Sequence, residues 1–366
     1  MLSPFCALLV AGGRPGGGGS VHRDIPDALA RHLSQLPATG RYQSEDLVRS
    51  ATADGRYVLA DRPHVYRYRI LDAAGTAITA GVVGSVAVDD PDTPLLPHEE
   101  LLVGEADTRR RERRRAAADT WPILVVTPAE LPDLADTGGS EVTVERSGLV
   151  HAVAPLADDA AAAVADSMSG HPLVIADGHH RHAVAQEHRA RLGAGNRPGP
   201  WDCIMAMVVG SGGRGLAGAA FHRVFDEVHP GPERFDAVFE VYAAPEIPVP
   251  PPPGAIGWWP GRGAPLLLVP RSGALVGTLP SPLRASGAAV ARALLYPMIG
   301  VEESKARYEA DPVVAARAAR PGGAAVLIPP IDPQAVLAAA AGGHRFPPKA
   351  TRFLPKPLPG ILIRTL

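Results

Sequence analysis

An acid, a glycine, two histidines and an arginine lie at the junction of an expected strand and an expected helix. The apolar run 172–176 indicates a buried strand, and the composition of 181–192 favours a helix. The junction comprises Asp177, Gly178, His179, His180 and Arg181. Because a helix N-terminus offers N–H groups and a partial positive charge, it favours a bound anion.

The residue types at this junction suit different parts of phosphate or carboxylate chemistry. Gly178 lets the backbone approach a ligand closely, and the Arg181 guanidinium donates paired hydrogen bonds to such anions. The Asp177 carboxylate is able to hold Mg²⁺ or accept a proton. A solvated first turn capped by Asp177 is the alternative. Four ionisable groups directly after a buried strand favour the functional interpretation.

A carboxylate next to an imidazole forms a second candidate. Glu99 follows His98 directly, and Pro97 before them fixes the backbone. Such a pair serves as a general base or as a metal ligand. A solvent-facing loop is an equally good interpretation of these residues alone.

Two further segments carry donors for an anion. Prolines stiffen the basic stretch 345–356, which predicts a rigid clamp for phosphate or carboxylate. Its donors are Lys349, Thr351, Arg352 and Lys356. The pair His222 and Arg223 forms a third cationic element. A basic edge strand and an exposed surface pair are the respective alternatives.

Composition indicates a globular protein and excludes several classes of partner. The chain has 366 residues, 46% of them hydrophobic, and a net charge of −2, which gives no argument for nucleic-acid binding. Its two cysteines, Cys6 and Cys203, match no disulfide or zinc pattern, so we expect a cytoplasmic protein. The apolar start is too short to span a bilayer. The arginine-rich run 109–115 is interpreted as a solvated helix face, because no aromatic residues alternate with it.

The irregular succession of expected strands and helices favours an α+β fold with a mixed sheet. We expect a variable segment at 1–58, a core at 59–244, a proline- and glycine-rich loop at 245–265 and a C-terminal α/β part at 266–366. Strands are expected at 57–71, 76–88, 123–127, 172–176, 203–209, 218–224, 265–270 and 324–328. Helices are expected at 25–35, 157–167, 181–192, 285–296, 312–319 and 333–341. The glycine-rich loop 11–20 lacks the ending of a P-loop.

Four ordered blocks resemble a widespread bacterial family catalogued as a domain of unknown function. The blocks are LPHE, HPLVIADGHHRHAVAQEHR, GLAGAAFHRVF and HRFPPKATRFLPKPLPGILI. The chain departs from the family pattern at Leu101, His182 and Ala350, where Thr, Tyr and Ser are typical, and it lacks a Pro-Pro-Tyr-Asp block near residue 20. These departures point to a changed substrate or a divergent paralogue.

The Asp-Gly-His-His-Arg block is also similar to that of the ParB/sulfiredoxin-like superfamily, which includes free serine kinases. This resemblance implies a ParB/sulfiredoxin-like core, Mg²⁺, ATP or ADP as phosphoryl donor, and a small hydroxylated acceptor such as free serine. It makes Glu99 the base, Asp177 a metal ligand or hydroxyl-orienting group, and His180 a further catalytic candidate. The residues expected to bind substrate or phosphate are His98, Gly178, His179, Arg181, His222, Arg223, Lys349, Thr351 and Lys356.

Two other functions remain open. A nucleotide-binding regulator of the ParB type would use the nucleotide to change partners, and a small acceptor would not raise its nucleotide turnover. A divergent biosynthetic enzyme would use the same anion site for other chemistry. The missing N-terminal block and Leu101 motivate this second alternative.

Overall fold

The computed structural model divides into two compact units. It describes residues 2–10, 51–53, 55, 57–102, 118–132, 134, 139–192, 198–212, 216–229, 232–246 and 248–366. Unit 1 comprises Met1–Leu96, Leu101–Leu216 and Pro355–Leu366, and unit 2 comprises Pro97–Glu100 and Ala217–Leu354. The glycine-rich loop 11–20, the helix expected at 25–35 and the arginine-rich run 109–115 lie outside the described residues. The domain boundaries expected from the sequence stay a prediction.

Unit 1 is built on a mixed nine-stranded sheet. Its order is β6-β11-β8-β12-β5-β4-β10-β9, and β1 pairs with β5. β8 and β12 run parallel, whereas β11 is antiparallel to β8 and β5 is antiparallel to β12. The strands are β1 Leu2–Ser3, β4 Tyr66–Leu71, β5 Ala77–Ala87, β6 Leu95–Pro97, β8 Ile123–Thr127, β9 Val142–Arg146, β10 Leu149–Pro155, β11 Leu173–Asp177 and β12 Cys203–Gly210.

Two helices pack on this sheet. Val164 of α4 (Asp158–Ser167) and Ala185 of α5 (His179–Arg191) belong to one buried apolar cluster with Val125 of β8. Burial of these side chains stabilises the position of α5 against the sheet. The start of α5 is thereby fixed at the end of β11, where the sequence predicts the anion site.

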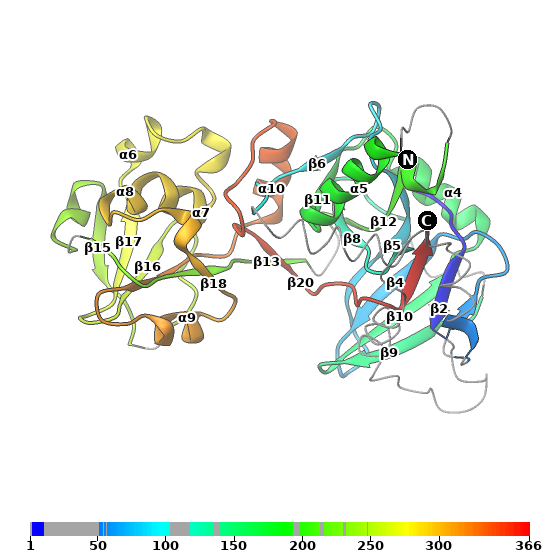
Figure 1. Ribbon diagram of the computed structural model, residues 1–366, viewed down its shortest axis with the longest axis horizontal. Coiled ribbons are helices and arrows are strands. Elements are labelled where there is room, and N and C mark those ends of the chain that lie inside the picture. Colours follow the sequence, from blue (N-terminus) through cyan, green and yellow to red (C-terminus); the bar gives the residue numbers. More distant parts are fainter. Residues whose placement is uncertain are drawn as a thin grey trace. The chain divides into compact units, whose positions relative to one another are not determined.

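A four-stranded sheet in unit 1 joins distant parts of the chain. Its order is β3 (Tyr57–Leu59), β2 (Ala7–Val10), β21 (Leu362–Thr365) and β7 (Ala118–Asp119). In Figure 1 the C-terminal strand β21 is red and β2 is blue, and the two pair antiparallel. The buried ion pair between Arg364 and Asp119, at 3.0 Å, links β21 to β7.

Unit 2 contains a six-stranded antiparallel sheet in the order β15-β17-β16-β19-β14-β18. The strands are β14 His222–Phe225, β15 Phe239–Ala243, β16 Ile256–Pro260, β17 Leu266–Pro270, β18 Arg307–Glu309 and β19 Ala324–Leu327. A separate pair consists of β13 (Ala217–Ala219) and β20 (Arg352–Leu354). This pair leads the chain out of the segment that carries Lys349 and Thr351.

Helices cover both faces of this six-stranded sheet. The α-helices in the described part of this unit are α6 Ser272–Val276, α7 Gly287–Val290, α8 Tyr296–Met298, α9 Pro312–Ala318 and α10 Pro333–Ala341, and a π-helical turn at Ala291–Leu295 joins α7 to α8. Val224 packs with Ala315 of α9, whereas Phe225 contacts Tyr296 of α8 edge to face. Since neighbouring residues of a strand point to opposite faces, α8 and α9 lie on opposite sides of the sheet (Figure 1).

The mixed α/β architecture with several sheets agrees with the sequence analysis, and α4 to α10 are seven α-helices in the described part of the chain. The expectation of a loop throughout 245–265 is wrong, because β16 lies within that range. Prolines and Gly254 form the turn before it, but Ile256, Trp258 and Trp259 are buried. Burial of large apolar side chains outweighs the proline- and glycine-rich surroundings.

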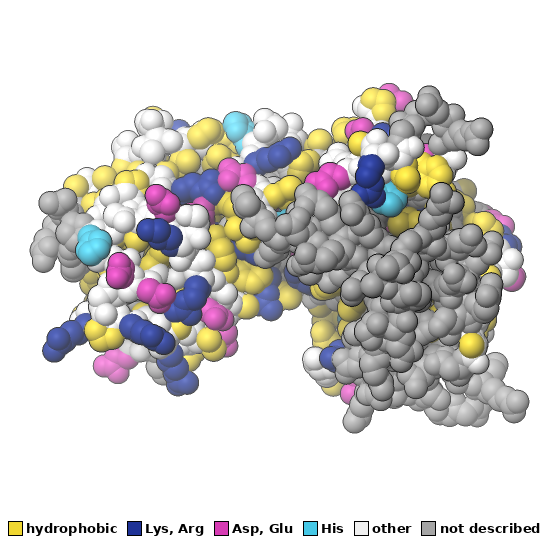
Figure 2. Space-filling model, viewed as in Figure 1, with side chains coloured by type: hydrophobic (Ala, Val, Ile, Leu, Met, Phe, Trp, Pro, Cys, Tyr) yellow, Lys and Arg dark blue, Asp and Glu magenta, His cyan; other side chains and the backbone are white. Residues whose placement is uncertain are grey.

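Two further features are the distribution of surface charge and the length and composition of the helices. Acidic and basic side chains are intermixed over the visible face of unit 2 (Figure 2). Of the helices that the structure describes, none combines the length and the apolar composition that crossing a bilayer requires.

Candidate functional site

Residues 98–100 of unit 2 lie beside Phe346 in a short parallel bridge. The Phe346 N–H donates to the His98 carbonyl at 2.7 Å, and the Glu100 N–H donates to the Phe346 carbonyl at 3.0 Å. This bridge places the segment after Phe346 next to Glu99. The sequence-predicted His-Glu pair and residues 345–354 of the proline-stiffened clamp therefore meet within one unit, whereas Lys356 belongs to unit 1.

Three hydrogen bonds orient the Glu99 carboxylate. The Lys349 N–H donates to Oε1 at 2.7 Å, and the N–H and hydroxyl of Thr351 donate to Oε2 at 3.2 and 3.1 Å. His98 Nε2 lies 2.8 Å from the same hydroxyl oxygen. Because that hydroxyl donates to Glu99, it accepts from His98, which forms a chain of hydrogen bonds from His98 through Thr351 to Glu99.

The environment of Glu99 changes its acidity. Only 9% of the residue is exposed, and this burial raises the pKa of the carboxyl group to about 7. The three hydrogen bonds and the Lys349 charge lower the pKa but do not cancel the effect of burial. A carboxylate with a pKa near neutrality is well matched to take a proton at physiological pH.

Lys349 adopts a backbone conformation that its residue type rarely takes. Its φ is 56°, in the left-handed region, and this turn of the chain accompanies the bond from its N–H to Glu99. Such strain persists where the surrounding structure enforces it, often at functional sites. The Lys349 ammonium lies 5.6 Å from the ring centre of Phe221.

The cationic pair of β14 is buried beside this segment. Arg223 donates to the carbonyls of Phe221 and Pro348 and lies 3.5 Å from Glu303. His222 accepts the Ile328 N–H through Nδ1 at 3.1 Å. Burial, and then the Arg223 charge, lower the pKa of His222 to about 4, so its ring is neutral at pH 7. Their role as phosphate ligands stays a prediction.

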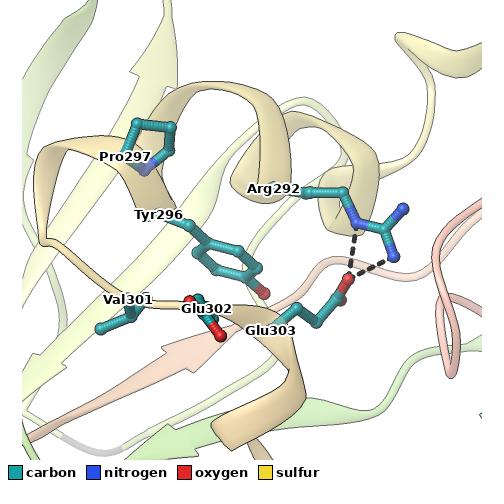
Figure 3. A pocket seen from close by; sticks show the side chains of 6 residues that line it. All are labelled: Arg292, Tyr296, Pro297, Val301, Glu302 and Glu303. Carbon is teal, nitrogen blue, oxygen red and sulfur yellow. Dashed lines mark hydrogen bonds and ion pairs between the residues drawn. The ribbon is translucent and has the colours of Figure 1, made fainter. Parts of the chain in front are cut away.

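An ion-pair network in this unit was not predictable from local sequence patterns. Arg292 donates to Glu303 at 2.6 Å (Figure 3). It also donates to Glu100 at 2.9 Å. Glu303 also faces Arg223, so it is shared by two arginines. The only available signal was the position of Glu100 directly after Glu99, because nothing local in the sequence marks Arg292 or Glu303 as partners.

In unit 1, Gly178 forms the junction between β11 and α5. It is the N-cap of α5 and has a left-handed φ of 100°. A Cβ atom at this position would lie 2.6 Å from Ile123 Cγ2. Both the backbone conformation and the space therefore require glycine. Asp177 is the last residue of β11, so it is not the cap of the helix.

Two cations hold the Asp177 carboxylate. Arg181 donates to Oδ2 at 2.6 Å, and the Lys356 ammonium contacts Oδ1. Arg181 also donates to the Trp121 and Pro122 carbonyls at 2.8 and 2.7 Å and lies over the Trp121 ring. The structure thus brings together three sequence-predicted residues and gives Arg181 a role in positioning Asp177.

These contacts do not fit a Mg²⁺ ion held by Asp177. Two cations next to one carboxylate repel a divalent cation. The part of the chain that the structure describes also contains no cluster of three or more His, Cys, Asp or Glu side chains suited to a metal.

The histidines of this junction face different surroundings. His180 Nε2 accepts the Leu102 N–H at 3.1 Å, and His179 is buried. The helix-to-sheet packing also buries His182, whose Nε2 lies 3.0 Å from the Val88 carbonyl and whose pKa is lowered by burial.

Comparison with known proteins places the chain in a family. The model of the family described as "Protein of unknown function (DUF1015)" matches residues 32–272, which is more than half of the chain. The protein is thus a mixed α/β protein with a buried carboxylate site, and it belongs to this family. The match confirms the family resemblance that the four sequence blocks indicate. No significant match is found among curated protein sequences.

Three solved structures illustrate the level of structural similarity. SbnI with a C-terminal truncation, from Staphylococcus aureus, has 11% identity and a TM-score of 0.41 over 76% of this chain and 85% of its own. A glutamate-to-alanine variant of a free serine kinase in complex with ADP has 16% identity and a TM-score of 0.40. The match covers 74% of this chain and 87% of that protein. A conserved hypothetical protein from Pyrococcus furiosus has 16% sequence identity and a TM-score of 0.40, and the match covers 76% of this chain and 93% of that protein.

Proposed function

We propose that this protein is a phosphotransferase that moves a phosphoryl group from ATP or ADP to the hydroxyl of a small metabolite, with free serine or a similar amino acid as the first candidate. The observation that carries the proposal is Glu99. Its carboxylate is buried, oriented by three hydrogen bonds and raised in pKa to about 7. These are the properties of a positioned general base.

The proposed reaction is a direct transfer. Glu99 takes the proton of the acceptor hydroxyl while the oxygen forms a bond to the terminal phosphorus of the nucleotide. The bond between that phosphorus and the bridging oxygen breaks, and the shortened nucleotide leaves with the electron pair. Such transfer depends mainly on positioning and on neutralisation of charge.

For unit 1 taken by itself, we propose that the start of α5 binds a phosphate group. A helix N-terminus favours an anion, and Gly178 keeps the backbone there unobstructed by a side chain. Lys356, which contacts Asp177, is the cation that would meet a phosphate. Arg181 acts as a positioning residue, because two carbonyls and Asp177 already engage its guanidinium. A ParB/sulfiredoxin-like core remains part of this proposal.

The experiment measures nucleotide consumption by the full chain with ATP or ADP, with and without L-serine. We expect serine to raise consumption many-fold and to yield a phosphorylated amino acid visible by phosphorus NMR. Glu99→Gln should abolish this increase, while Glu227→Gln, which changes an exposed glutamate of unit 2, should leave it intact. Consumption that no small hydroxylated acceptor raises would contradict the proposal and favour the nucleotide-binding regulator.

A further inference from the structure

Unit 2 contains a pocket of about 370 Å³ beside the ion-pair network (Figure 3). Its lining residues are Arg292, Tyr296, Pro297, Val301, Glu302 and Glu303. One wall comes from the π-helical turn and α8, and the other from the segment that starts at Val301. A π-helical turn is rare and frequently marks a functional site.

The charges around this pocket do not cancel. Glu303 lies between Arg223 and Arg292, and Arg292 also pairs with Glu100, so two arginines and two glutamates balance one another. Glu302 is the fifth charge. It is exposed, accepts a hydrogen bond from the Ser304 hydroxyl at 3.2 Å, and forms no ion pair with any residue that the structure describes. The pocket therefore has one excess negative charge.

A buried hydroxyl group also faces this pocket. Only 2% of Tyr296 is exposed, and its hydroxyl, which lies close to the Arg223 guanidinium, makes no hydrogen bond of ordinary geometry with the described residues. Figure 3 shows its ring between the two walls, with the hydroxyl directed toward Glu303. Because a buried hydroxyl without a well-aligned partner is costly, a polar ligand at this position would supply a favourable hydrogen bond.

We infer that this pocket binds the ammonium end of a small hydroxylated amine. Glu302 supplies the uncompensated charge, Glu303 a second carboxylate, and the Tyr296 hydroxyl a further polar group. Pro297 and Val301 give apolar contact to the carbon chain. An acid of the same shape without an amine is a poor ligand, since it would bring negative charge to a pocket that already has an excess of it.

An ion pair connects this pocket to the residue that follows the proposed base. The Arg292 that lines it pairs with Glu100, the next residue after Glu99. Assignment of the ligand as the phosphoryl acceptor rests on the proposed function, but binding of the amine does not. The test therefore omits the nucleotide, so that failure of binding and failure of turnover remain distinguishable.

The test is a ligand-observed NMR titration of the full chain with L-serine, ethanolamine and L-glycerate. Glycerate replaces the amine of serine by a hydroxyl and keeps the rest. We expect serine and ethanolamine to bind and glycerate to bind at least tenfold more weakly. Glu302→Gln should weaken binding of both amines about threefold, and Glu302→Lys should abolish it.

Glu227→Gln is the matched control, because it removes an exposed carboxylate elsewhere in unit 2 and should leave the affinity unchanged. Equal binding of glycerate and serine would overturn the inference, as would unchanged serine affinity in Glu302→Lys or no binding of either amine. Amine binding with the expected selectivity, combined with no phosphoryl transfer, would contradict the proposed function alone.

Discussion

Thr351 donates its hydroxyl hydrogen bond to Glu99 over 3.1 Å, although 252 positions separate the two residues in the sequence. The backbone N–H of Thr351 donates to the same carboxylate oxygen. His98 lies on the other side of the hydroxyl at 2.8 Å. The C-terminal segment therefore determines how the carboxylate of the proposed base is oriented.

Replacement of Thr351 by valine tests this relationship. The change keeps the shape and the backbone N–H but removes the hydroxyl, whose bond lowers the pKa of Glu99. We expect the Glu99 pKa to rise further, and the free energy of unfolding at pH 8 to fall by about 1–3 kcal/mol. Thr351→Ser, which keeps the hydroxyl, should restore most of the loss in denaturant unfolding. Equal stabilities of the valine and serine variants would show that the hydroxyl bond contributes nothing.

The raised pKa of Glu99 predicts a pH dependence of stability. Between its ordinary pKa of 4.5 and about 7, the folded state binds more protons at this group than the unfolded state. Its contribution to the free energy of unfolding therefore decreases as pH rises through this interval, by about 3 kcal/mol in total. His222 and His151, whose pKa values burial lowers to about 4, act in the opposite direction over the interval 4 to 6.5.

Comparison of Glu99→Gln with the wild type separates the contribution of Glu99 to this pH dependence from that of the histidines. The difference in unfolding free energy between Glu99→Gln and the wild type should change by about 3 kcal/mol from pH 4.5 to pH 8, in favour of the variant at high pH. Glu227→Gln should follow the wild type at every pH. A constant difference between Glu99→Gln and wild type would mean that Glu99 titrates normally.

We expect a single methyl group added at position 178 to lower the free energy of unfolding strongly. Gly178→Ala places a Cβ in a left-handed conformation and 2.6 Å from Ile123 Cγ2. We expect a loss of about 2–4 kcal/mol of unfolding free energy. Gly75→Ala is the control, because Gly75 also has a positive φ but has no neighbouring atom within 4 Å, and it should lose only about 1 kcal/mol. Similar losses at both positions would contradict the steric requirement at the junction.

Because Asp177 contacts both Arg181 and Lys356, we expect substitution of Asp177 to destabilise the protein more than substitution of Lys356. Asp177→Asn leaves both Arg181 and Lys356 without their counter-charge, so we expect a loss of about 1–3 kcal/mol. Lys356→Met should cost about 1 kcal/mol or less, since Arg181 still pairs with the carboxylate. The double variant should cost less than the sum of the two, as measured by chemical denaturation. Additive effects would show that the two residues do not interact.

Local patterns predicted much of the fold. The apolar run before Asp177 formed a strand, and the residues after Gly178 formed a helix, because short-range burial and helix composition determine both. The segment that contains Trp258 was the exception, since its burial depends on strands distant in the sequence. Sequence blocks were sufficient to predict the family.

The candidate site was predicted in its residue types but not in its contacts. The structure brings His98 and Glu99 to Thr351, and Asp177 to Lys356. The sequence indicated an available Arg181, whereas the structure shows a guanidinium engaged by two carbonyls and a carboxylate. These hydrogen bonds to Arg181 form because the Trp121 and Pro122 carbonyls lie next to it in the fold, which no local sequence pattern reveals.

The pH dependence of acceptor-stimulated nucleotide turnover tests the central claim most directly. If Glu99 is the base, kcat/KM should rise with pH and level off above a midpoint of about 7, where the carboxylate becomes ionised. Glu99→Gln should lose the turnover at every pH, and Glu227→Gln should keep both the rate and the midpoint. Turnover by Glu99→Gln at the wild-type rate, or a wild-type profile flat from pH 6 to pH 8, would contradict the account.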